Sequence, residues 1–413
     1  MNTSTTADII IIGAGPAGLF CAANIGATGK KVLVLEKKSG PGNKLLLAGS
    51  GQCNITHEGP ARDFLTHYGV KGSFLKPALM NFPNTSLVSY FLERGLEMVT
   101  TKAGKVFPAT LKSTDVLNIL EKACVTNGVT ILLNEPVQEV SHNNNLFVIR
   151  TLNKTFRGRL LVIATGGSSY PGTGSTGDGY HFASSLGHTI VEIAPALAPV
   201  IAEKYPFGDL SGISFETMSF SLWRNGKKIG SHRGDILFTH QGLSGPGILD
   251  YSRFILPGDT IRLSFTGRIP AEALAKEFSE KITACPVKNI KTIVLQYRIP
   301  ERLATMLLQL SGIPEDLTCA HLSKLQRTTL ITNLVEFPVK VGKLGGFQEA
   351  MVTRGGVSLQ EIEPKTMESR LVPGLYFAGE IIDLDGDTGG YNLQAAFSTG
   401  FQAAKAIINV HKV

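Results

Sequence analysis

The chain has 413 residues, enough for roughly two or three domains and a large hydrophobic core. Hydrophobic residues make up 43% and charged residues 18%, which excludes an intrinsically disordered protein and fits a globular one. The net charge of +7 fits an ordinary basic enzyme and also a protein that attracts anionic partners such as RNA, and no block of consecutive basic residues decides between them.

The N-terminal segment Met1–Ala7 is polar and lacks the basic and apolar regions of a secretory signal. The apolar run after it is too short to span a membrane, so we expect a cytoplasmic protein without membrane association. The cysteines include no C-x-x-C pair, which argues against a disulfide framework, a zinc site or an iron–sulfur cluster. They are Cys21, Cys53, Cys124, Cys285 and Cys319.

A nucleotide-binding pattern opens the chain. Four isoleucines, Ile9–Ile12, predict a strand buried on both faces, and Gly13-Ala-Gly15-Pro-Ala-Gly18 follows at once. The glycines allow a tight turn, close approach of the backbone to a pyrophosphate, and close packing of helix on strand. Val32–Leu35 predicts the next strand, and Glu36 ends it where a carboxylate would bind a ribose hydroxyl. Together these features predict a dinucleotide site.

Alternating strands and helices continue to about residue 190. The predicted helices are Leu87–Arg94, Ser113–Asn127 and Asp178–Leu186, with Ser113 as the expected cap of the second. The predicted strands are Thr130–Leu133, Val137–Val140, Leu146–Thr151, a buried strand from Leu160 to Gly167, and His188–Ile193.

The pattern changes near Glu192. Short strands separated by turns predict an antiparallel domain: Val200–Ile201, Met218–Trp223, Lys227–Ile229, Ile236–Phe238 and Thr260–Phe265. Helices are predicted at Ala271–Ala284, Ile290–Gln296, Pro300–Leu310 and Leu322–Leu334, and β-structure returns at Glu336–Val341. We therefore expect a discontinuous α/β nucleotide domain (1–191 and 343–413), an inserted β subdomain (192–268 and 335–342) and a helical subdomain (269–334).

A second glycine-rich turn lies near the C-terminus. A strand ending at Ala378-Gly379-Glu380 is followed by Gly389-Gly390-Tyr391-Asn392-Leu393, which opens a helix predicted to reach Asn409. The N-terminus of this helix could stabilise the negative charge of a reduced flavin. Asp383, Asp385 and Asp387 imitate the start of an EF-hand loop, but Thr388 and Gln394 stand where glycine and glutamate are needed, so we expect no metal.

Three further segments could carry chemistry. The loop from Lys44 to Asn54 contains Cys53, which could be a general acid or a flavin neighbour, although a small packed thiol is the more common role. His240 ends a predicted strand and could act as an acid or base, although a lone histidine is more often structural. Gly172-Thr-Gly-Ser-Thr-Gly177 matches G-x-G-x-x-G, but it does not follow its strand directly, so we expect a loop of the flavin or substrate cavity rather than an NAD(P) site.

These segments together resemble the BaiN/YhiN-like flavoproteins, also known as aminoacetone-oxidase-like enzymes. The resemblance rests on Gly13–Gly18, Lys44–Asn54, Ala164–Gly167, Tyr170–Gly179, Thr239–Pro246, Gly355–Val357 with Pro364–Ser369, and Gly374–Gly400. It implies a two-dinucleotide-fold FAD domain with inserted subdomains, and a redox enzyme. Gln52 departs from the arginine that many members carry, so the resemblance implies no anion-binding role at this position.

The motifs and the resemblance lead to an expected cofactor site for FAD. Its residues are Gly13, Gly15, Pro16, Ala17, Gly18, Glu36, Lys37, Lys44, Gly51, Gln52, Cys53, Asn54, Val137, Thr165, Gly166, Gly379, Glu380, Gly389, Gly390, Tyr391, Asn392 and Leu393. The candidate catalytic residues are His240, Cys53 and Tyr391.

The expected function is hydride transfer between flavin N5 and a small-molecule substrate or unsaturated ring, with NAD(P)H as a candidate transient donor. Two alternatives stay open: an FAD-dependent enzyme that reduces uridine in RNA, and a flavin-binding protein without catalysis. The sequence indicates neither the substrate nor an oligomeric state.

Overall fold

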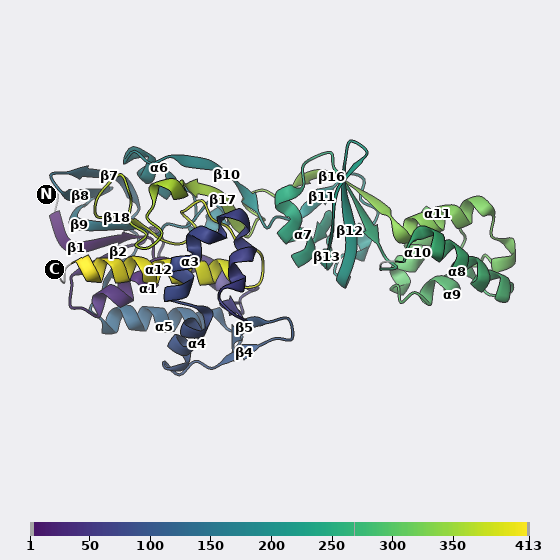
Figure 1. The fold of residues 1–413 in the computed structure, drawn as a ribbon, viewed down its shortest axis with the longest axis horizontal. Helices are drawn as coiled ribbons and strands as arrows, with labels where there is room; N and C mark the ends of the chain where they lie inside the picture. Colours follow the sequence, from purple (N-terminus) through teal and green to yellow (C-terminus); the bar gives the residue numbers. More distant parts are fainter. Residues whose placement is uncertain (1–3, 268, 411–413) are drawn as a thin grey trace. The chain divides into compact units, whose positions relative to one another are not determined.

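The computed structural model describes residues 4–267 and 269–410 (Figure 1). The chain divides into two compact units, which are described separately below. Unit 1 comprises Met1–Ala196 and Phe347–Val413, and unit 2 comprises Leu197–Gly346. Among the described residues, no helix is both long and apolar enough to cross a membrane.

A seven-stranded sheet forms the core of unit 1, in the order β6-β2-β1-β9-β8-β7 with β18 also paired to β9. Its parallel part consists of β1 (Ser4–Ile12), β2 (Val32–Leu35), β6 (Thr130–Leu132), β9 (Thr155–Ile163) and β18 (Leu375–Phe377). Its antiparallel part adds β7 (Val137–Asn143) and β8 (Leu146–Thr151). The predicted Rossmann-like α/β fold is therefore confirmed.

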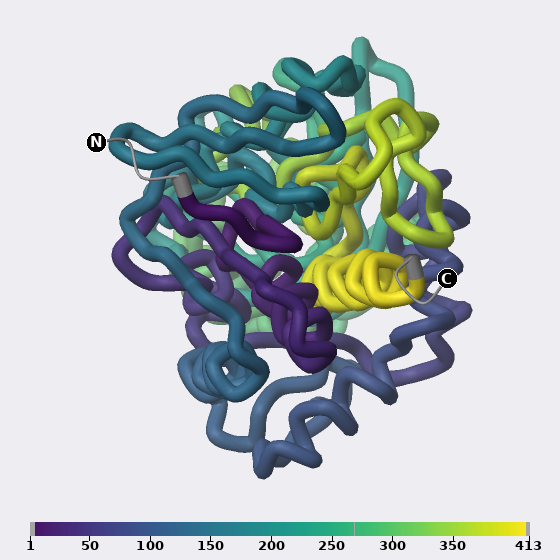
Figure 2. The backbone as a smooth tube through the Cα atoms, turned by 90° about the vertical axis from the view of Figure 1, so that its left-hand side faces the viewer, coloured from purple at the N-terminus to yellow at the C-terminus, as the bar shows by residue number. Residues whose placement is uncertain are grey.

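The two ends of the chain meet on this sheet. Helix α1 (Pro16–Gly26) follows β1, and α12 (Tyr391–Val410) follows β18 and packs against α1 (Figure 2). Phe20 of α1 contacts Phe397 of α12 edge to face, with ring centroids 5.3 Å apart. Since all four isoleucines of Ile9–Ile12 are at most 5% exposed, both faces of β1 are covered, as the unbroken apolar run predicts.

The rest of unit 1 contains elements that the sequence pattern did not predict. These are α2 (Asn43–Leu47), the 3₁₀ segment Asp63–Lys71, α3 (Gly72–Asn81), and a small sheet of β3 (Thr56–His57), β4 (Met98–Thr100) and β5 (Lys105–Pro108). The predicted elements α4 (Asn84–Leu92), α5 (Ser113–Thr126) and α6 (Asp178–Ser185) are present.

Two details of unit 1 differ from expectation. Ser113 does not cap α5: it is the first helical residue, and its hydroxyl donates to the carbonyl of Leu46 at 3.0 Å, tying the helix to α2. Strand β10 (Ile190–Ala196) pairs with β17 (Val352–Val357), so residues 192–196 belong to unit 1 rather than to the insertion, and residues 343–346 belong to unit 2 rather than to the nucleotide domain.

Unit 2 combines a closed antiparallel barrel with a group of helices. The barrel order is β11-β14-β13-β12-β15-β16. Its strands are β11 (Val200–Ala202), β12 (Ser214–Arg224), β13 (Lys227–Phe238), β14 (Gly242–Ser244), β15 (Thr260–Ser264) and β16 (Phe337–Leu344). The helices are α7 (Pro246–Tyr251), α8 (Ala271–Ala284), α9 (Ile290–Leu295), α10 (Glu301–Leu310) and α11 (Lys324–Val335).

One apolar core serves both parts of unit 2. Buried barrel residues such as Phe238 and Leu263 belong to the same cluster as Leu307 of α10 and Leu330 of α11. The two short strands predicted around residues 227–238 are a single strand of 12 residues, β13.

Candidate functional site

The first glycine-rich turn has the geometry of an anion site at a helix N-terminus. Gly13 has φ of +103°, and a Cβ there would lie 2.5 Å from the carbonyl oxygen of Ala164. A Cβ on Gly18 would lie 2.0 Å from the carbonyl oxygen of Gly13. Gly15 differs, because a Cβ on it would meet no heavy atom of the described residues within 4 Å. Packing requires Gly13 and Gly18, whereas Gly15 leaves space open in front of α1, where helical N–H groups lack helical partners.

Glu36 stands beside this turn at the end of β2. Its Oε2 accepts a hydrogen bond from the Ala14 N–H at 2.9 Å, and its Oε1 accepts one from the Lys38 N–H at 2.9 Å. A carboxylate has about four lone-pair sites, so two of them remain for the hydroxyls of a ribose. The backbone therefore orients Glu36 and leaves it capacity to bind a sugar.

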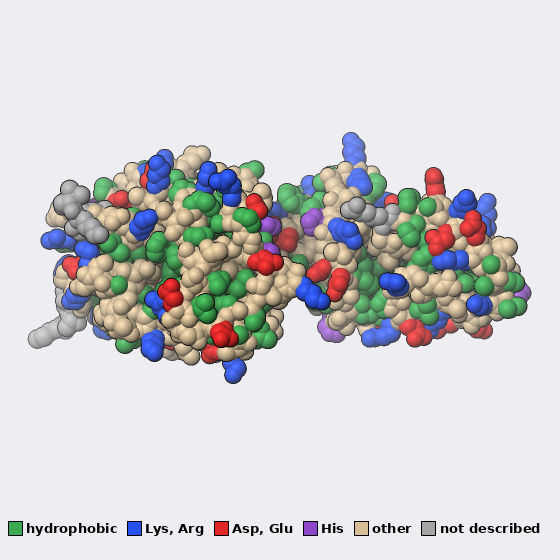
Figure 3. All heavy atoms as spheres, turned by 60° about the horizontal axis from the view of Figure 1, so that its bottom comes forward, with side chains coloured by type: hydrophobic (Ala, Val, Ile, Leu, Met, Phe, Trp, Pro, Cys, Tyr) green, Lys and Arg blue, Asp and Glu red, His purple; other side chains and the backbone are tan. Residues whose placement is uncertain are grey.

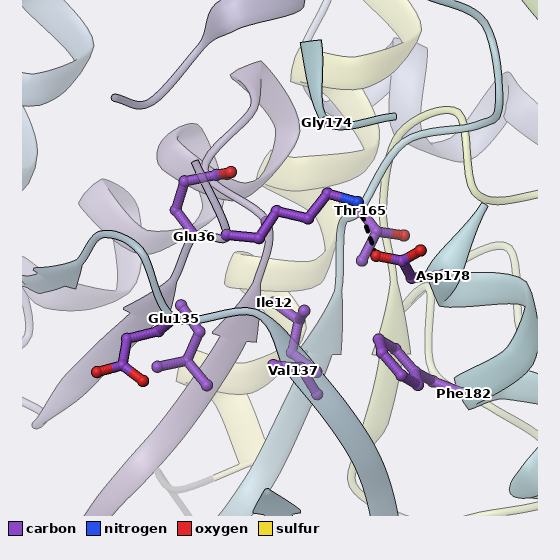
Figure 4. Close-up of a pocket in the computed structure, with 11 residues that line it drawn as sticks. Ile12, Glu36, Glu135, Val137, Thr165, Gly174, Asp178 and Phe182 are labelled. Atoms are coloured by element: carbon purple, nitrogen blue, oxygen red, sulfur yellow. Dashed lines mark hydrogen bonds and ion pairs between the residues drawn. The ribbon is translucent and has the colours of Figure 1, made fainter. Parts of the chain in front are cut away.

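A pocket opens at the ends of β1, β2 and β9 (Figure 4). Its lining residues are Ile12, Gly13, Leu35, Glu36, Lys37, Glu135, Val137, Thr165, Gly174, Asp178 and Phe182. Predicted site residues from four separate segments therefore come together here: Gly13, the Glu36–Lys37 pair, Val137 and Thr165. Gly166 follows Thr165 with φ of +75°.

The second G-x-G-x-x-G segment forms one wall of this pocket. Lys37 Nζ donates to Asp178 Oδ2 at 2.7 Å and also to Thr176 Oγ1, and Thr176 Oγ1 donates to the other oxygen of Asp178 at 2.6 Å. Burial alone would raise the pKa of Asp178, but the hydrogen bonds from Lys37 and Thr176 lower it below the usual range. The loop and the start of α6 thus line the pocket together with Glu36, and an ion pair joins α6 to the segment that follows β2.

The second glycine-rich turn lies directly against the first. A Cβ on Gly379 would be 2.9 Å from the Cβ of Ala17, and a Cβ on Gly400 would be 2.5 Å from the Ala17 carbonyl oxygen. The Gly379 N–H donates to Thr399 Oγ1 of α12 at 2.9 Å. Segments more than 360 residues apart in sequence therefore pack directly against each other.

An ion pair between Lys44 and Glu380 lies next to this contact, since Glu380 directly follows Gly379. Lys44 Nζ contacts both carboxylate oxygens of Glu380, at 2.7 and 3.0 Å. The Thr353 N–H donates to Glu380 Oε1 at 2.9 Å, and a Cβ on Gly167 would meet this same oxygen at 2.6 Å. Lys44 and Glu380 remain 24% and 20% exposed, so both can still reach a bound molecule.

Gly389 and Gly390 are required by backbone geometry. Both have positive φ, +117° and +96°, and a Cβ on Gly390 would lie 2.5 Å from the carbonyl oxygen of Thr56. Asn392 binds the preceding loop through its side chain, which accepts from the Gly386 N–H at 2.8 Å and donates to the Gly386 carbonyl at 2.9 Å. The side chain of Asn392 therefore shapes the turn, and the half-buried Leu393 packs against the core of unit 1.

Tyr391 lies between two histidine rings that the sequence analysis missed. The ring of His67 stacks on Tyr391 at 3.9 Å and that of His57 at 5.3 Å, with interplanar angles of 13° and 15°. His67 Nδ1 is 3.1 Å from Asp387 Oδ2, and the ring remains 36% exposed. The sequence carried no signal for this group, because both histidines lie in segments without helical or strand periodicity.

The loop before β3 contains residues of opposite exposure. Gln52 is exposed, Gly51 is half-buried and Cys53 is fully buried. Burial raises the pKa of the Cys53 thiol to about 12, so the thiol lacks both the exposure and the acidity that proton transfer requires. Asn54 Oδ1 is buried without a hydrogen-bond partner among the described residues, which leaves an acceptor for an N–H of a ligand.

His240 is exposed in the turn after β13 and belongs to unit 2. It is therefore not among the residues that unit 1 brings together around the two turns.

Known proteins resemble this chain over almost its whole length. The model of the family described as "HI0933-like protein Rossmann domain" matches residues 7–406. A relative from Escherichia coli (strain K12), named ribosomal RNA dihydrouridine synthase, is 32% identical over 97% of this chain and 98% of its own. A relative from Clostridium scindens, named 3-dehydro-bile acid delta(4,6)-reductase, is 30% identical over 96% and 98%.

A solved structure shares the fold. The 3-ketosteroid delta1-dehydrogenase of Sterolibacterium denitrificans superimposes with a TM-score of 0.51 at 14% identity, covering 98% of this chain and 100% of its own.

Proposed function

This chain belongs to the HI0933-like protein Rossmann domain family, as the resemblance drawn from its motifs indicated, and we propose that it is an FAD-dependent oxidoreductase. The observation that carries the proposal is the contact between the two glycine-rich turns, Gly379 on Ala17. The first turn would hold the pyrophosphate of a dinucleotide, and the second, which packs against it, would support a ring system.

Each part of the cofactor has a matching group in unit 1. The open space at Gly15 would receive the pyrophosphate, the lone pairs of Glu36 that Ala14 and Lys38 leave would bind the ribose, and Val137 would line the adenine end. At the other end, the buried Asn54 Oδ1 would accept from a ring N–H, and α12 begins at Tyr391 with the partial positive charge of a helix N-terminus.

The chemistry that the flavin supplies when bound is hydride transfer at its ring. The names of two relatives, a dihydrouridine synthase and a delta(4,6)-reductase, have hydrogen addition to an unsaturated ring in common, and this is the reaction we assign. NADH or NADPH is the electron donor in this proposal.

A proton must accompany the hydride, and His67 is the residue that we propose to supply it. Its ring is partly exposed, lies against Tyr391 at the start of α12, and has Asp387 to hold Nδ1. Cys53 is fully buried, and burial raises the pKa of its thiol to about 12, so it does not fit this role.

RNA is the second candidate substrate, and the distribution of charge favours it. Residues 197–346 contain 18 Lys and Arg against 13 Asp and Glu, so this unit carries +5 of the chain's net charge of +7. Excess positive charge attracts the phosphate backbone of a nucleic acid.

The test is anaerobic reduction followed by reoxidation. NADH or NADPH should bleach the visible flavin bands, and either an RNA transcript or a cyclic enone should restore them while losing its double bond. A flavin that no nicotinamide donor and no unsaturated substrate can turn over would instead identify a flavin-binding protein without catalysis.

A further inference from the structure

We propose that the outer face of the barrel in unit 2 is a docking surface for single-stranded RNA. This inference rests on the proposed function with RNA as the substrate. It goes beyond that function by naming the surface that holds the RNA outside the flavin site.

Strand register defines the surface. Ser219, Ser221 and Trp223 of β12 lie opposite Arg233, Ser231 and Lys228 of β13, and opposite Ser264, Arg262 and Thr260 of β15. On β16, Pro338 and Lys340 lie opposite Arg262 and Thr260. Residues directly opposite each other in a sheet project from the same face, so these eleven residues, called the outer panel below, form one surface.

The outer panel faces away from the core. The residues that alternate with it, such as Phe220, Leu222, Ile261, Leu263 and Val339, are all buried in the core of unit 2. None of the eleven panel residues is buried.

Composition distinguishes the outer panel from the surrounding surface. It contains four basic residues (Lys228, Arg233, Arg262 and Lys340), five serines and threonines, Trp223 and Pro338, but no acidic residue. On the molecular face drawn in Figure 3, basic and acidic side chains are intermixed over the surface, so net charge alone does not single out a site. The small hydroxyl side chains let a nucleic-acid backbone approach and also donate to its phosphates.

Trp223 and Arg262 form a stacking group within the outer panel. Arg262 Cζ lies 4.0 Å from the centroid of the Trp223 ring, and Trp223 Nε1 donates to Ser221 Oγ at 2.8 Å. Indole rings and guanidinium planes both stack on unpaired bases, and four-stranded sheet faces that carry aromatic residues bind single-stranded RNA in this way.

Two acidic neighbours border the outer panel without closing it. Glu336 pairs with Arg262 and Glu203 with Lys340, each at 2.8 Å. All four side chains are at least 35% exposed, and exposed ion pairs of this kind contribute little to stability. A phosphate can therefore replace either carboxylate.

The experiment compares two double variants of the full-length, flavin-loaded protein. Lys228→Glu with Lys340→Glu changes two exposed lysines of the outer panel. Lys276→Glu with Lys324→Glu changes two exposed lysines on α8 and α11, in the same unit and with the same change in net charge. The probe is a short, fluorescein-labelled single-stranded RNA of mixed sequence, and binding is followed by anisotropy over a range of salt concentrations.

Each phosphate contact to a single strand contributes about 0.7 to the slope of log affinity against log salt. Loss of two contacts should lower that slope by about 1.4, which weakens binding about 25-fold at ~0.1 M salt. The control pair should change affinity by less than about threefold, since it removes the same charge at a distance from the bound strand. Trp223 is the only tryptophan of the chain, so its emission should change with the same midpoint as the anisotropy.

Three results overturn the proposal: equal losses in the two double variants, wild-type RNA binding that is absent or insensitive to salt, and unchanged Trp223 emission at saturation. Flavin content and bleaching by NADH or NADPH are measured on the same preparations. Failure of those two readouts refutes the oxidoreductase, whereas intact flavin chemistry without panel-dependent RNA binding refutes the docking surface alone.

Discussion

Replacing Gly15 with alanine should separate cofactor binding from folding. A Cβ on Gly15 meets no described atom within 4 Å, and its φ of −80° and ψ of −179° are open to any L-residue. The variant should therefore fold normally, and the lower chain entropy of its unfolded state should stabilise the apoprotein by roughly 0.4–1 kcal/mol. The added methyl group nevertheless occupies the space through which a pyrophosphate approaches the backbone.

The expected loss of FAD affinity follows from the hydrogen bonds that the methyl group prevents. A hydrogen bond to a charged group contributes about 1.5–3 kcal/mol, so loss of two of them costs roughly 3–6 kcal/mol. That range corresponds to a decrease in affinity on the order of 10²- to 10⁴-fold. Titration of the apoprotein with FAD, followed by quenching of flavin fluorescence, measures it.

Two other glycines provide matched controls. Gly172→Ala also adds a Cβ to open space, but in the 3₁₀ turn Pro171–Thr173 rather than at the N-terminus of α1, so FAD affinity and stability should both be kept. Gly18→Ala places a Cβ 2.0 Å from a backbone oxygen, and overpacking of this kind typically costs about 1–3 kcal/mol of folding stability. If Gly15→Ala binds FAD as tightly as Gly172→Ala, the assignment of the pyrophosphate to this turn is wrong.

Further predictions concern the pocket, the proton donor and the cysteines. Lys37→Met should speed FAD release in stopped-flow measurements, because it removes the ion pair between Lys37, which follows β2, and Asp178 at the start of α6. An unchanged release rate would refute a role for that pair in retention. The pKa of Asp178 is lowered in the folded protein, so this ion pair stabilises the fold fully above the ordinary aspartate pKa of 3.8 and loses its effect as the pH falls through the folded pKa. The melting temperatures of wild type and Lys37→Met should therefore converge in acid. A difference in melting temperature that stays constant with pH would contradict this. His67→Gln should lower the rate of substrate reduction at least about tenfold while flavin content stays at one per chain, and an unaltered pH–rate profile would exclude His67 as the proton donor. Iodoacetamide at neutral pH should alkylate the half-buried Cys285 before Cys53 and Cys124, because burial raises the thiol pKa values of Cys53 and Cys124 to about 12. Peptide mass spectrometry measures the order of alkylation, and the reverse order would contradict the prediction.

Local chemistry made part of this molecule predictable. The run Ile9–Ile12 could only be a strand covered on both faces, and the glycine spacing after it required a turn into a helix. The pair Gly389-Gly390 likewise indicated that another backbone segment comes close. A Cβ on Gly390 would lie 2.5 Å from the carbonyl oxygen of Thr56. These features follow from a few consecutive residues, so the sequence alone predicts them.

Features that depend on distant partners were not predictable. The stack of His57 and His67 on Tyr391 joins segments over 300 residues apart, and neither histidine lies in a periodic pattern. Strand β13 was divided into two because Gly230, Ser231, His232 and Gly234 lack apolar alternation, although pairing with β12 makes them one strand. Helix α3 contains Pro77, which obscured its helical pattern.

The central claim, that two glycine-rich turns from opposite ends of the chain build one FAD site, is tested most directly by the cofactor that the purified protein carries. The protein should show the two visible absorption bands of an oxidised flavin, and denaturation should release one FAD per chain, identified by mass. The Gly15→Ala variant, prepared in parallel, should be folded and colourless. A wild-type protein that is colourless and takes up no FAD on titration, or one that releases a different nucleotide, would contradict the account.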